Sequence, residues 1–297
     1  FVRENMNTTV RGRKDLKNLN VPFLGEIPYY VSRKNRPTLE QRIRFWKKPK
    51  EVRQMVVKAG KRNIVNEAFR VLRTNFEFTI GTHPEQNVIV FTSFNPGSGK
   101  SHLAANMAMS LAIKKKKVLL IDGDLRHGST SMVINSPGEG LSDYLNGRVA
   151  DIHDILYKGE ENGLVKYFDV IPIGTIPPNP TELLFTPLLE QMIKTMRQEY
   201  DYVFIDCPPI EVVADTPIYE QFADRTIFVV RAGLMERNML PEIDALYKEK
   251  KFKNMTMILN GTKARGGRYG SHYGYGYGYG YGYGYNYNKE KSGGAKS

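Results

Sequence analysis

One stretch constrains this sequence more than any other: VIVFTSFNPGSGKS at positions 88–101. Its apolar, β-branched start predicts a buried strand. A small-residue loop with two glycines follows, and Gly-Lys-Ser then leads into a segment with the composition of a buried helix. Glycines let backbone N–H groups approach phosphate oxygens closely, and a helix N-terminus adds free donors and a positive dipole end. This order of strand, loop, Lys-Ser and helix predicts a phosphate-binding loop.

The loop and the first helical turn supply the candidate nucleotide-binding residues: Asn95, Pro96, Gly97, Ser98, Gly99, Lys100, Ser101 and His102. Lys100 is expected to face the solvent at the ligand site and to reach the β- and γ-phosphates, while the Ser101 hydroxyl is expected to ligate Mg²⁺. The full G-x-x-x-x-G-K-[ST] pattern requires glycine where this chain has Phe94. An ordinary strand–turn–helix connection is therefore the alternative.

Two further apolar runs end in carboxylates. The run at 118–121 is followed by Asp122 and Asp124, and the run at 202–205 by Asp206. Ligands of open α/β sheets bind at the carboxyl ends of strands, so these side chains are expected to point toward the phosphate-binding loop. Capping residues of strand-end turns are the alternative interpretation. The candidate catalytic residues are Lys100, Asp122, Asp124 and Asp206, and the candidate Mg²⁺ ligands are Ser101, Asp124 and Asp206.

The rest of the body alternates apolar runs with helical patterns. Predicted strands lie at 170–174, 226–230 and 256–260, and a predicted helix lies at 240–250. This alternation predicts an α/β fold: a doubly wound, mostly parallel sheet with helices on both faces.

A single cysteine, Cys207, excludes a disulfide framework. No apolar run is long enough for a membrane span, and because the chain starts at Phe1 we interpret it as part of a longer protein.

The positive charge is concentrated in residues 1–62, which hold 17 Lys/Arg and 5 Asp/Glu. We interpret this range as a basic juxtamembrane or linker segment that contains a short strand or docking segment at 21–28. Its centre, RIRFWKKPK at 42–50, places two aromatic residues among the basic ones. That combination suits an anionic membrane surface. A solvated linker is the alternative, and nucleic acid, the other polyanion, is a disfavoured partner.

The segment at 63–78 predicts a helix in which Ala68, Leu72 and Phe76 form a buried stripe. A second stripe of the same helix carries three charged side chains, Glu67, Arg70 and Arg73. Local ion pairs on a solvated face would explain them. The alternative is a subunit contact, which makes these three residues the candidate oligomer interface.

The C-terminal residues, 263–297, have a different composition from the predicted domain at 63–262. Nine tyrosines fall within nineteen residues, glycine stands at nearly every second position, and aliphatic residues are absent from the tyrosine tract. No core can form there, so we expect a disordered tail. An adhesive aromatic tract is one interpretation, and an array of phosphate acceptors is the other. The candidate acceptors are Tyr269, Tyr273, Tyr275, Tyr277, Tyr279, Tyr281, Tyr283, Tyr285 and Tyr287.

Eight features together resemble the cytoplasmic kinase part of the bacterial tyrosine kinases (BY-kinases), which are attached to polysaccharide co-polymerases. They are LGEIP at 24–28, E-x-x-R-x-x-R at 67–73, PGSGKS at 96–101, LLIDGDLR at 119–126, GLSDYL at 140–145, PPNPTELL at 177–184, YDYVFIDCPP at 200–209 and the tyrosine cluster. The resemblance implies a P-loop NTPase-like fold, ATP/ADP and Mg²⁺ as cofactors, and autophosphorylation of the tail between subunits. It also implies a ring-shaped homo-oligomer, for which an octamer is one expectation.

The same resemblance implies partners and a location. The partners are its own or an adjacent membrane-spanning co-polymerase part and a cognate phosphotyrosine phosphatase. The location is the cytoplasmic face of the bacterial inner membrane, where the family controls capsular or exopolysaccharide synthesis and export. A tyrosine hydroxyl must lose its proton during transfer, and Asp122 is the candidate acceptor. The sequence leaves open which of Asp122 and Asp124 is the base and which binds the metal.

Two departures from related patterns matter. His127-Gly128 follows Arg126 where the family usually has proline two residues after the arginine, which affects the expected conformation of the next loop. Asn95 stands where the cell-division and plasmid-partition ATPases carry a signature lysine. Two alternative functions remain. One is a partition-type ATPase without a protein substrate, and the other is a non-catalytic, nucleotide-binding regulator of a membrane assembly.

Overall fold

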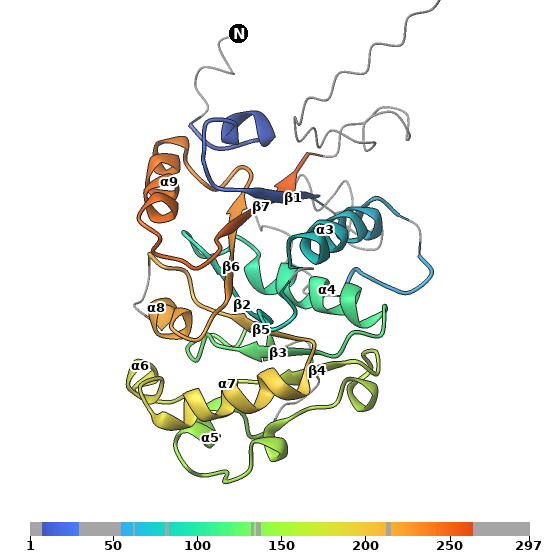
Figure 1. Ribbon diagram of the computed structural model, residues 1–297, viewed down its shortest axis with the longest axis vertical. Coiled ribbons are helices and arrows are strands. Elements are labelled where there is room, and N and C mark those ends of the chain that lie inside the picture. The colour runs from blue at the N-terminus through green and yellow to red at the C-terminus, as the bar shows by residue number, and fades with distance from the viewer. Residues whose placement is uncertain are drawn as a thin grey trace, which may run out of the picture. The chain divides into compact units, whose positions relative to one another are not determined.

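The computed structural model describes residues 8–29, 55–61, 63–80, 83–131, 134, 138–211 and 215–263. The described residues fall in one compact unit. Within the described residues a seven-stranded sheet has the order β1-β7-β6-β2-β5-β3-β4, and each pair of neighbouring strands is parallel (Figure 1). The strands are β1 (Phe23–Pro28), β2 (Val88–Ser93), β3 (Val118–Asp122), β4 (Phe168–Ile171), β5 (Tyr202–Asp206), β6 (Arg225–Arg231) and β7 (Thr256–Thr262).

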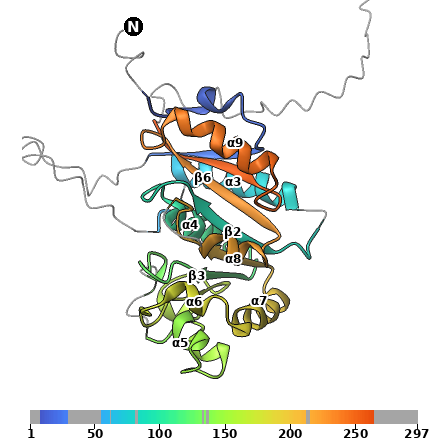
Figure 2. The ribbon, with the colours of Figure 1, turned by 90° about the vertical axis from the view of Figure 1, so that its left-hand side faces the viewer.

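Helices cover both faces of this sheet (Figures 1 and 2). They are α3 (Ile64–Ile80), α4 (Lys100–Ala112), α5 (Leu141–Leu145), α6 (Pro180–Leu183), α7 (Pro187–Glu199), α8 (Asp215–Glu220) and α9 (Leu240–Lys248). Helices α3 and α4 pack on one face, and α5, α7, α8 and α9 pack on the other. The predicted doubly wound α/β fold is confirmed.

The central strand β2 shows how the sequence specifies this layering. Ile89 and Phe91 pack into the core under α3 and α4, whereas Val88 and Val90 pack into the core on the opposite face. Successive side chains of a strand point to opposite faces, so a strand covered on both sides has to be apolar at every position. The uninterrupted apolar run therefore correctly predicted a buried strand, and the structure places it at the centre of the sheet.

The N-terminal boundary differs from the expected one. The predicted segment at 21–28 forms β1, which pairs in parallel with β7 at one edge of the sheet. Val10, Leu16 and Val21 are buried in the core beneath α9. Residues 8–29 and 55–61 are thus part of the same compact unit as the sheet, and the expected division at residue 62 does not apply to them. The basic cluster at 42–50 lies outside the described residues.

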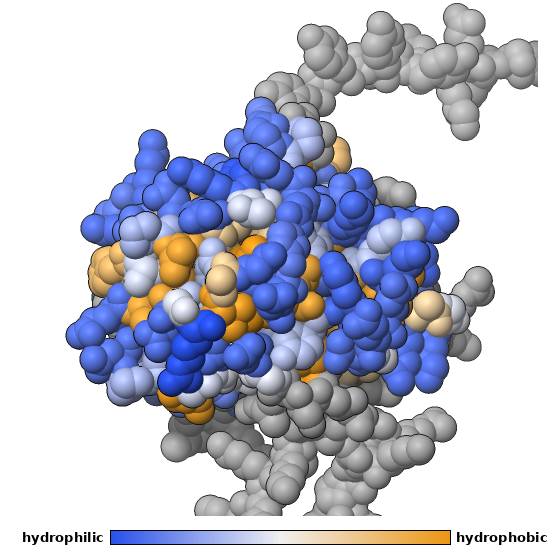
Figure 3. All heavy atoms as spheres, turned by 90° about the horizontal axis from the view of Figure 1, so that it is seen from below, coloured by the Kyte–Doolittle hydropathy of each residue, from blue (hydrophilic) through white to orange (hydrophobic). Residues whose placement is uncertain are grey.

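The strand predicted at 170–174 begins two residues earlier and ends at Ile171. The next two carbonyl groups, those of Pro172 and Ile173, accept hydrogen bonds from the N–H groups of Leu141 and Ser142 at 2.8 and 2.9 Å. The start of α5 therefore takes the place of a sheet neighbour. Figure 3 views the molecule from the end that carries α5 and α7, where hydrophobic patches lie among hydrophilic residues.

Among the described residues, none of the helices has both the length and the apolar character needed to cross a membrane. This agrees with the absence of a long apolar run in the sequence.

Candidate active site

The phosphate-binding loop follows β2 and turns directly into α4. Gly97 and Gly99 have φ angles of +75° and +86°, which side-chain-bearing residues rarely adopt, so the glycines permit this reversal of the chain. The Oγ atoms of Ser93 and Ser98 donate to the carbonyl oxygen of Asn95 at 2.9 and 2.7 Å. No side chain in the described part caps the N-terminus of α4. The loop is therefore held in shape while the helix end can receive an anion.

Side chains from distant parts of the sequence contact this loop. Asn260, on β7, donates its Nδ2 to the carbonyl oxygen of Ser98 at 2.9 Å. Asn95 donates to Glu211, in the segment after β5, at 2.8 Å. In the first helical turn Ser101 is half-buried, and the ring of His102 lies 3.3 Å from Asn106 Nδ2. The expected nucleotide-binding residues thus form one continuous segment, braced by β7 and by the segment after β5.

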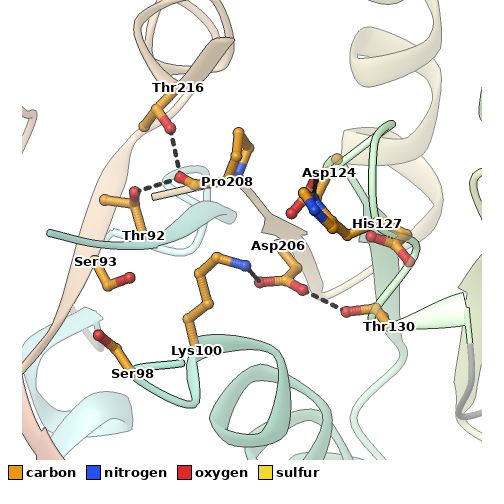
Figure 4. Close-up of polar contacts among 12 residues, drawn as sticks. Thr92, Ser93, Ser98, Lys100, Asp124, His127, Thr130, Asp206, Pro208 and Thr216 are labelled. Atoms are coloured by element: carbon orange, nitrogen blue, oxygen red, sulfur yellow. Dashed lines mark hydrogen bonds and ion pairs between the residues drawn. The ribbon is translucent and has the colours of Figure 1, made fainter. Parts of the chain in front are cut away.

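Lys100 does not face the solvent as expected: its side chain is only 9% exposed, and its Nζ lies 3.5 Å from Asp206 Oδ1 (Figure 4). Burial acts to lower the pKa of this lysine, but the carboxylates of Asp206, Asp124 and Asp122 outweigh it, and the pKa is raised. Lys100 therefore stays charged and neutralises part of a buried acidic cluster. The structure thus brings the other three candidate catalytic residues close enough to act on the charge of Lys100.

Asp122 and Asp206 end the neighbouring strands β3 and β5 and stand opposite each other in the register. Both are fully buried. Burial, with the neighbouring Asp206 carboxylate as the next cause, raises the pKa of Asp122 to about 7. A carboxylate that titrates near neutral pH suits a group that accepts a proton in catalysis. Asp124, in the turn after β3, is also buried, and its Oδ1 lies 3.4 Å from Nδ1 of the exposed His127 (Figure 4).

Two carboxylate oxygens in this cluster are buried without a hydrogen bond in the described part of the chain, and one of them, Asp206 Oδ1, belongs to a candidate Mg²⁺ ligand and faces the ammonium group of Lys100. Asp122 Oδ1 and Asp206 Oδ1 have no hydrogen-bond partner among the described residues, and buried polar atoms in folded proteins are nearly always satisfied. The described residues contain no group of three or more His, Cys, Asp or Glu that could hold a metal by itself. Mg²⁺ commonly binds through one or two carboxylates, with phosphates and waters completing its shell. Asp206, Asp124 and the Ser101 hydroxyl are the residues that would hold it.

Three residues of this site were not identified from the sequence. Thr130 and Ser131 donate hydrogen bonds to Asp206 and Asp122, and Asn260 holds the phosphate-binding loop. Asn260 could have been found, because it lies near the carboxyl end of a predicted strand, where ligand sites gather. The two hydroxyl residues carry no comparable signal in the sequence.

The charged stripe of α3 divides into two parts. Glu67 and Arg70 are exposed and form a local ion pair of 2.8 Å. Arg73 instead points inward: it is buried, and its Nη1 donates to the carbonyl oxygen of Ser110 on α4 at 2.8 Å. The expectation that all three lie on one outer stripe is wrong for Arg73. The nine candidate acceptor tyrosines lie outside the described residues.

The fold and the site define a nucleotide-binding protein of the P-loop NTPase-like class. A family model described as an AAA domain matches residues 86–235. The chain is 34% identical to the tyrosine-protein kinase CpsD of Streptococcus agalactiae over 208 residues, which cover 69% of this chain and 87% of that protein. It is 33% identical to the tyrosine-protein kinase YwqD of Bacillus subtilis over 228 residues, covering 75% and 92%. The chain therefore belongs to the bacterial tyrosine-protein kinase family.

A solved structure agrees with this assignment. The kinase domain of the Escherichia coli tyrosine kinase ETK matches 90% of this chain and 100% of its own length, with a TM-score of 0.72 and 28% identity. Some relatives are much longer. The chain is 35% identical over 201 residues, 67% of its length, to the putative tyrosine-protein kinase AmsA of Erwinia amylovora, yet it spans only 26% of that protein.

Proposed function

We propose that this chain transfers the γ-phosphoryl group of ATP to the tyrosines of its own C-terminal cluster, in trans within a homo-oligomer. The observation that carries the proposal is the buried group of Lys100, Asp122, Asp124 and Asp206 at the end of a phosphate-binding loop, in a chain with nine closely spaced tyrosines. An ATPase without a protein substrate would leave those tyrosines unexplained.

The geometry supports a division of roles. Gly97, Gly99 and the N-terminus of α4 present backbone N–H groups to the phosphates, and Lys100 brings a positive charge to the same place. When bound, Mg²⁺ would neutralise charge on the transferring group; Ser101, Asp124 and Asp206 are the proposed ligands. Asp122, with a pKa of about 7, is the proposed acceptor of the phenol proton.

The names of the relatives support a proposed setting. One is named a putative tyrosine-protein kinase in the cps region of Klebsiella pneumoniae, and we propose the same context here: control of capsular or exopolysaccharide synthesis and export at the cytoplasmic face of the inner membrane. The proposed partners are a membrane-spanning co-polymerase part and a phosphotyrosine phosphatase. Residues 42–50, which combine basic and aromatic side chains, are proposed to contact anionic lipid.

A mixture of two chains tests transfer in trans, because one chain has no activity and the other has no tail tyrosines. One chain carries Lys100→Met and an intact tail, and the other is active but has phenylalanine at all nine tail tyrosines. We expect phosphotyrosine on the first chain, spread over several sites. A tract with nearly the same neighbours at every position gives a site little to discriminate by, so proximity within an oligomer would replace sequence recognition. Mass spectrometry of tail peptides measures the sites.

Each chain alone is the control and should stay unmodified on its tail. If the tail is phosphorylated only when it shares a chain with an intact Lys100, over a wide range of concentrations, transfer in trans is wrong. ATP turnover without phosphotyrosine in the wild type would favour the partition-type ATPase. Nucleotide binding with neither turnover nor transfer would favour the non-catalytic regulator.

The oligomer contact is proposed to use Glu67 and Arg70, since both are exposed. Alanine at both positions should yield smaller species by light scattering and change the unfolding free energy by less than about 1 kcal/mol, because exposed ion pairs contribute little. A Glu67→Ala/Arg70→Ala variant as large as the wild type, before any phosphorylation, would remove these two residues from the interface.

Arg73→Ala should lower the unfolding free energy by roughly 1.5–3 kcal/mol, because a buried charged donor to Ser110 is lost.

A further inference from the structure

Two neighbouring hydroxyl residues each hold one of the buried carboxylates of the site. Thr130 Oγ1 donates to Asp206 Oδ2 at 2.6 Å (Figure 4). The backbone N and the Oγ of Ser131 both donate to Asp122 Oδ2, at 2.6 and 2.7 Å. All four side chains are buried. Thr130 and Ser131, here called the hydroxyl pair, thus contact the two carboxylates from the loop that follows β3.

These bonds determine which oxygen of each carboxylate is available. The hydroxyl pair occupies Oδ2 of Asp206 and of Asp122, and both Oδ1 atoms have no hydrogen-bond partner in the described part. Asp206 Oδ1 is the atom that lies 3.5 Å from Lys100 Nζ. A carboxylate can rotate about its last side-chain bond, so a donor fixed on one oxygen directs the other. The bond from Thr130 therefore leaves Asp206 Oδ1 directed toward Lys100.

The hydroxyl pair is itself fixed by the fold. Ser131 Oγ accepts a hydrogen bond of 2.9 Å from the N–H of Ile173, just beyond β4. Gly128, at φ +53°, approaches the same residue so closely that a Cβ there would lie 2.8 Å from Ile173 Cδ1. The loop is therefore braced against the end of β4. Its hydroxyls are donors held in place before any ligand arrives, which is the arrangement that lowers the reorganisation needed on binding.

We propose that Thr130 and Ser131 are positioning residues: Thr130 orients Asp206 for the magnesium ion of the nucleotide, and Ser131 orients Asp122 for the incoming tyrosine. This inference rests on the proposed function for Asp206 and Asp122 and goes beyond it, because it assigns a role to two residues that act through those carboxylates. Partners that orient metal-binding side chains commonly change metal affinity by about 10–100-fold when removed.

The decisive variant is Thr130→Val, which keeps the shape of the side chain and removes the donor. A fluorescent N-methylanthraniloyl-ADP probe is titrated with Mg²⁺, and the Mg²⁺ concentration at half-maximal signal is measured. We expect that concentration to rise about tenfold or more in Thr130→Val. Thr130→Ser, which restores the hydroxyl, should stay within about twofold of the wild type. Binding of the probe without Mg²⁺ should be nearly the same in all three.

A matched control separates positioning from general destabilisation. Thr226 Oγ1 donates to Glu220 Oε2, also at 2.6 Å and also buried, near the amino end of β6 and away from the phosphate-binding loop. Thr226→Val loses the same kind of bond, so it should lower thermal stability without changing the Mg²⁺ dependence. If Thr130→Val and Thr226→Val behave alike in the Mg²⁺ titration, Thr130 has only a structural role and the proposal is overturned for it.

Ser131→Ala is the second variant, and it tests the role of Ser131 independently of Thr130→Val. It keeps the backbone N–H bond to Asp122 and removes only the hydroxyl. We expect kcat for tail phosphorylation to fall about tenfold or more while KM for ATP changes by less than about twofold. Unchanged kcat would overturn the role of Ser131.

The Mg²⁺ titration needs no phosphoryl transfer. A chain that binds Mg-nucleotide as expected but forms no phosphotyrosine would therefore refute the proposed function and leave the role of Thr130 standing.

Discussion

Lys100→Met is expected to abolish phosphotyrosine on the tail and also to destabilise the nucleotide-free chain. The first effect follows from the loss of the charge that binds the phosphates. The second follows from burial: Lys100 is the positive charge paired with Asp206, and Asp122 and Asp124 lie close by. Removing one partner of a buried ion pair typically costs about 3–5 kcal/mol. Anti-phosphotyrosine blots and urea unfolding without nucleotide measure the two effects.

A second substitution separates these effects. Asp206→Asn in the Lys100→Met background removes the carboxylate that would be left unpaired, so it should recover much of the lost stability. It should not recover phosphotyrosine, because both residues serve the reaction. Full phosphorylation of Lys100→Met, freshly expressed in cells without another tyrosine kinase, would contradict the assignment of the site. A Lys100→Met chain as stable as the wild type would instead show that the ion pair contributes nothing to folding.

Gly99→Ala should damage the phosphate-binding loop far more than Gly97→Ala. Both glycines have positive φ angles, +86° and +75°, so both variants carry a backbone strain of about 1–2 kcal/mol. They differ in the space for a Cβ. At Gly99 it would lie 2.3 Å from Asn260 Nδ2 and 3.3 Å from Arg231 Nη1, whereas no atom lies within 4 Å at Gly97. Only Gly99→Ala therefore displaces the side chain that holds the Ser98 carbonyl oxygen.

We expect Gly99→Ala to lose more unfolding free energy than Gly97→Ala and to weaken ADP binding by about tenfold or more, which corresponds to about 1.4 kcal/mol. Urea unfolding and calorimetric titration with ADP measure these changes. Adding Asn260→Ala to Gly99→Ala makes room for the methyl group, so the two substitutions should be non-additive. Equal unfolding free energies for the two glycine variants would show that the contact with Asn260 is not the cause.

The sequence by itself determined the architecture of the sheet and the place of the site. Apolar, β-branched runs such as 88–91 identify strands buried on both faces. Because all strands of a parallel sheet end at the same edge, carboxylates that follow such runs have to gather there. This is why Asp122, Asp124 and Asp206 could be placed beside the predicted phosphate-binding loop before their positions were known, and why the local Gly-Lys-Ser motif could be placed at the start of a helix that follows a strand.

Only the tertiary structure decided where individual side chains point. Arg73 lies three residues from Arg70 on the same helix, yet it turns inward because Ser110, 37 residues away, offers a buried carbonyl acceptor. Segment 23–28 becomes an edge strand because β7 exposes an unpaired edge more than two hundred residues later. Lys100 is buried beside Asp206 at the end of β5, and Asp122 of β3 and Asp124 of the next turn are close enough to act on its charge. In each case the deciding partner comes from a distant part of the chain, and periodicity within one segment carries no information about such a partner.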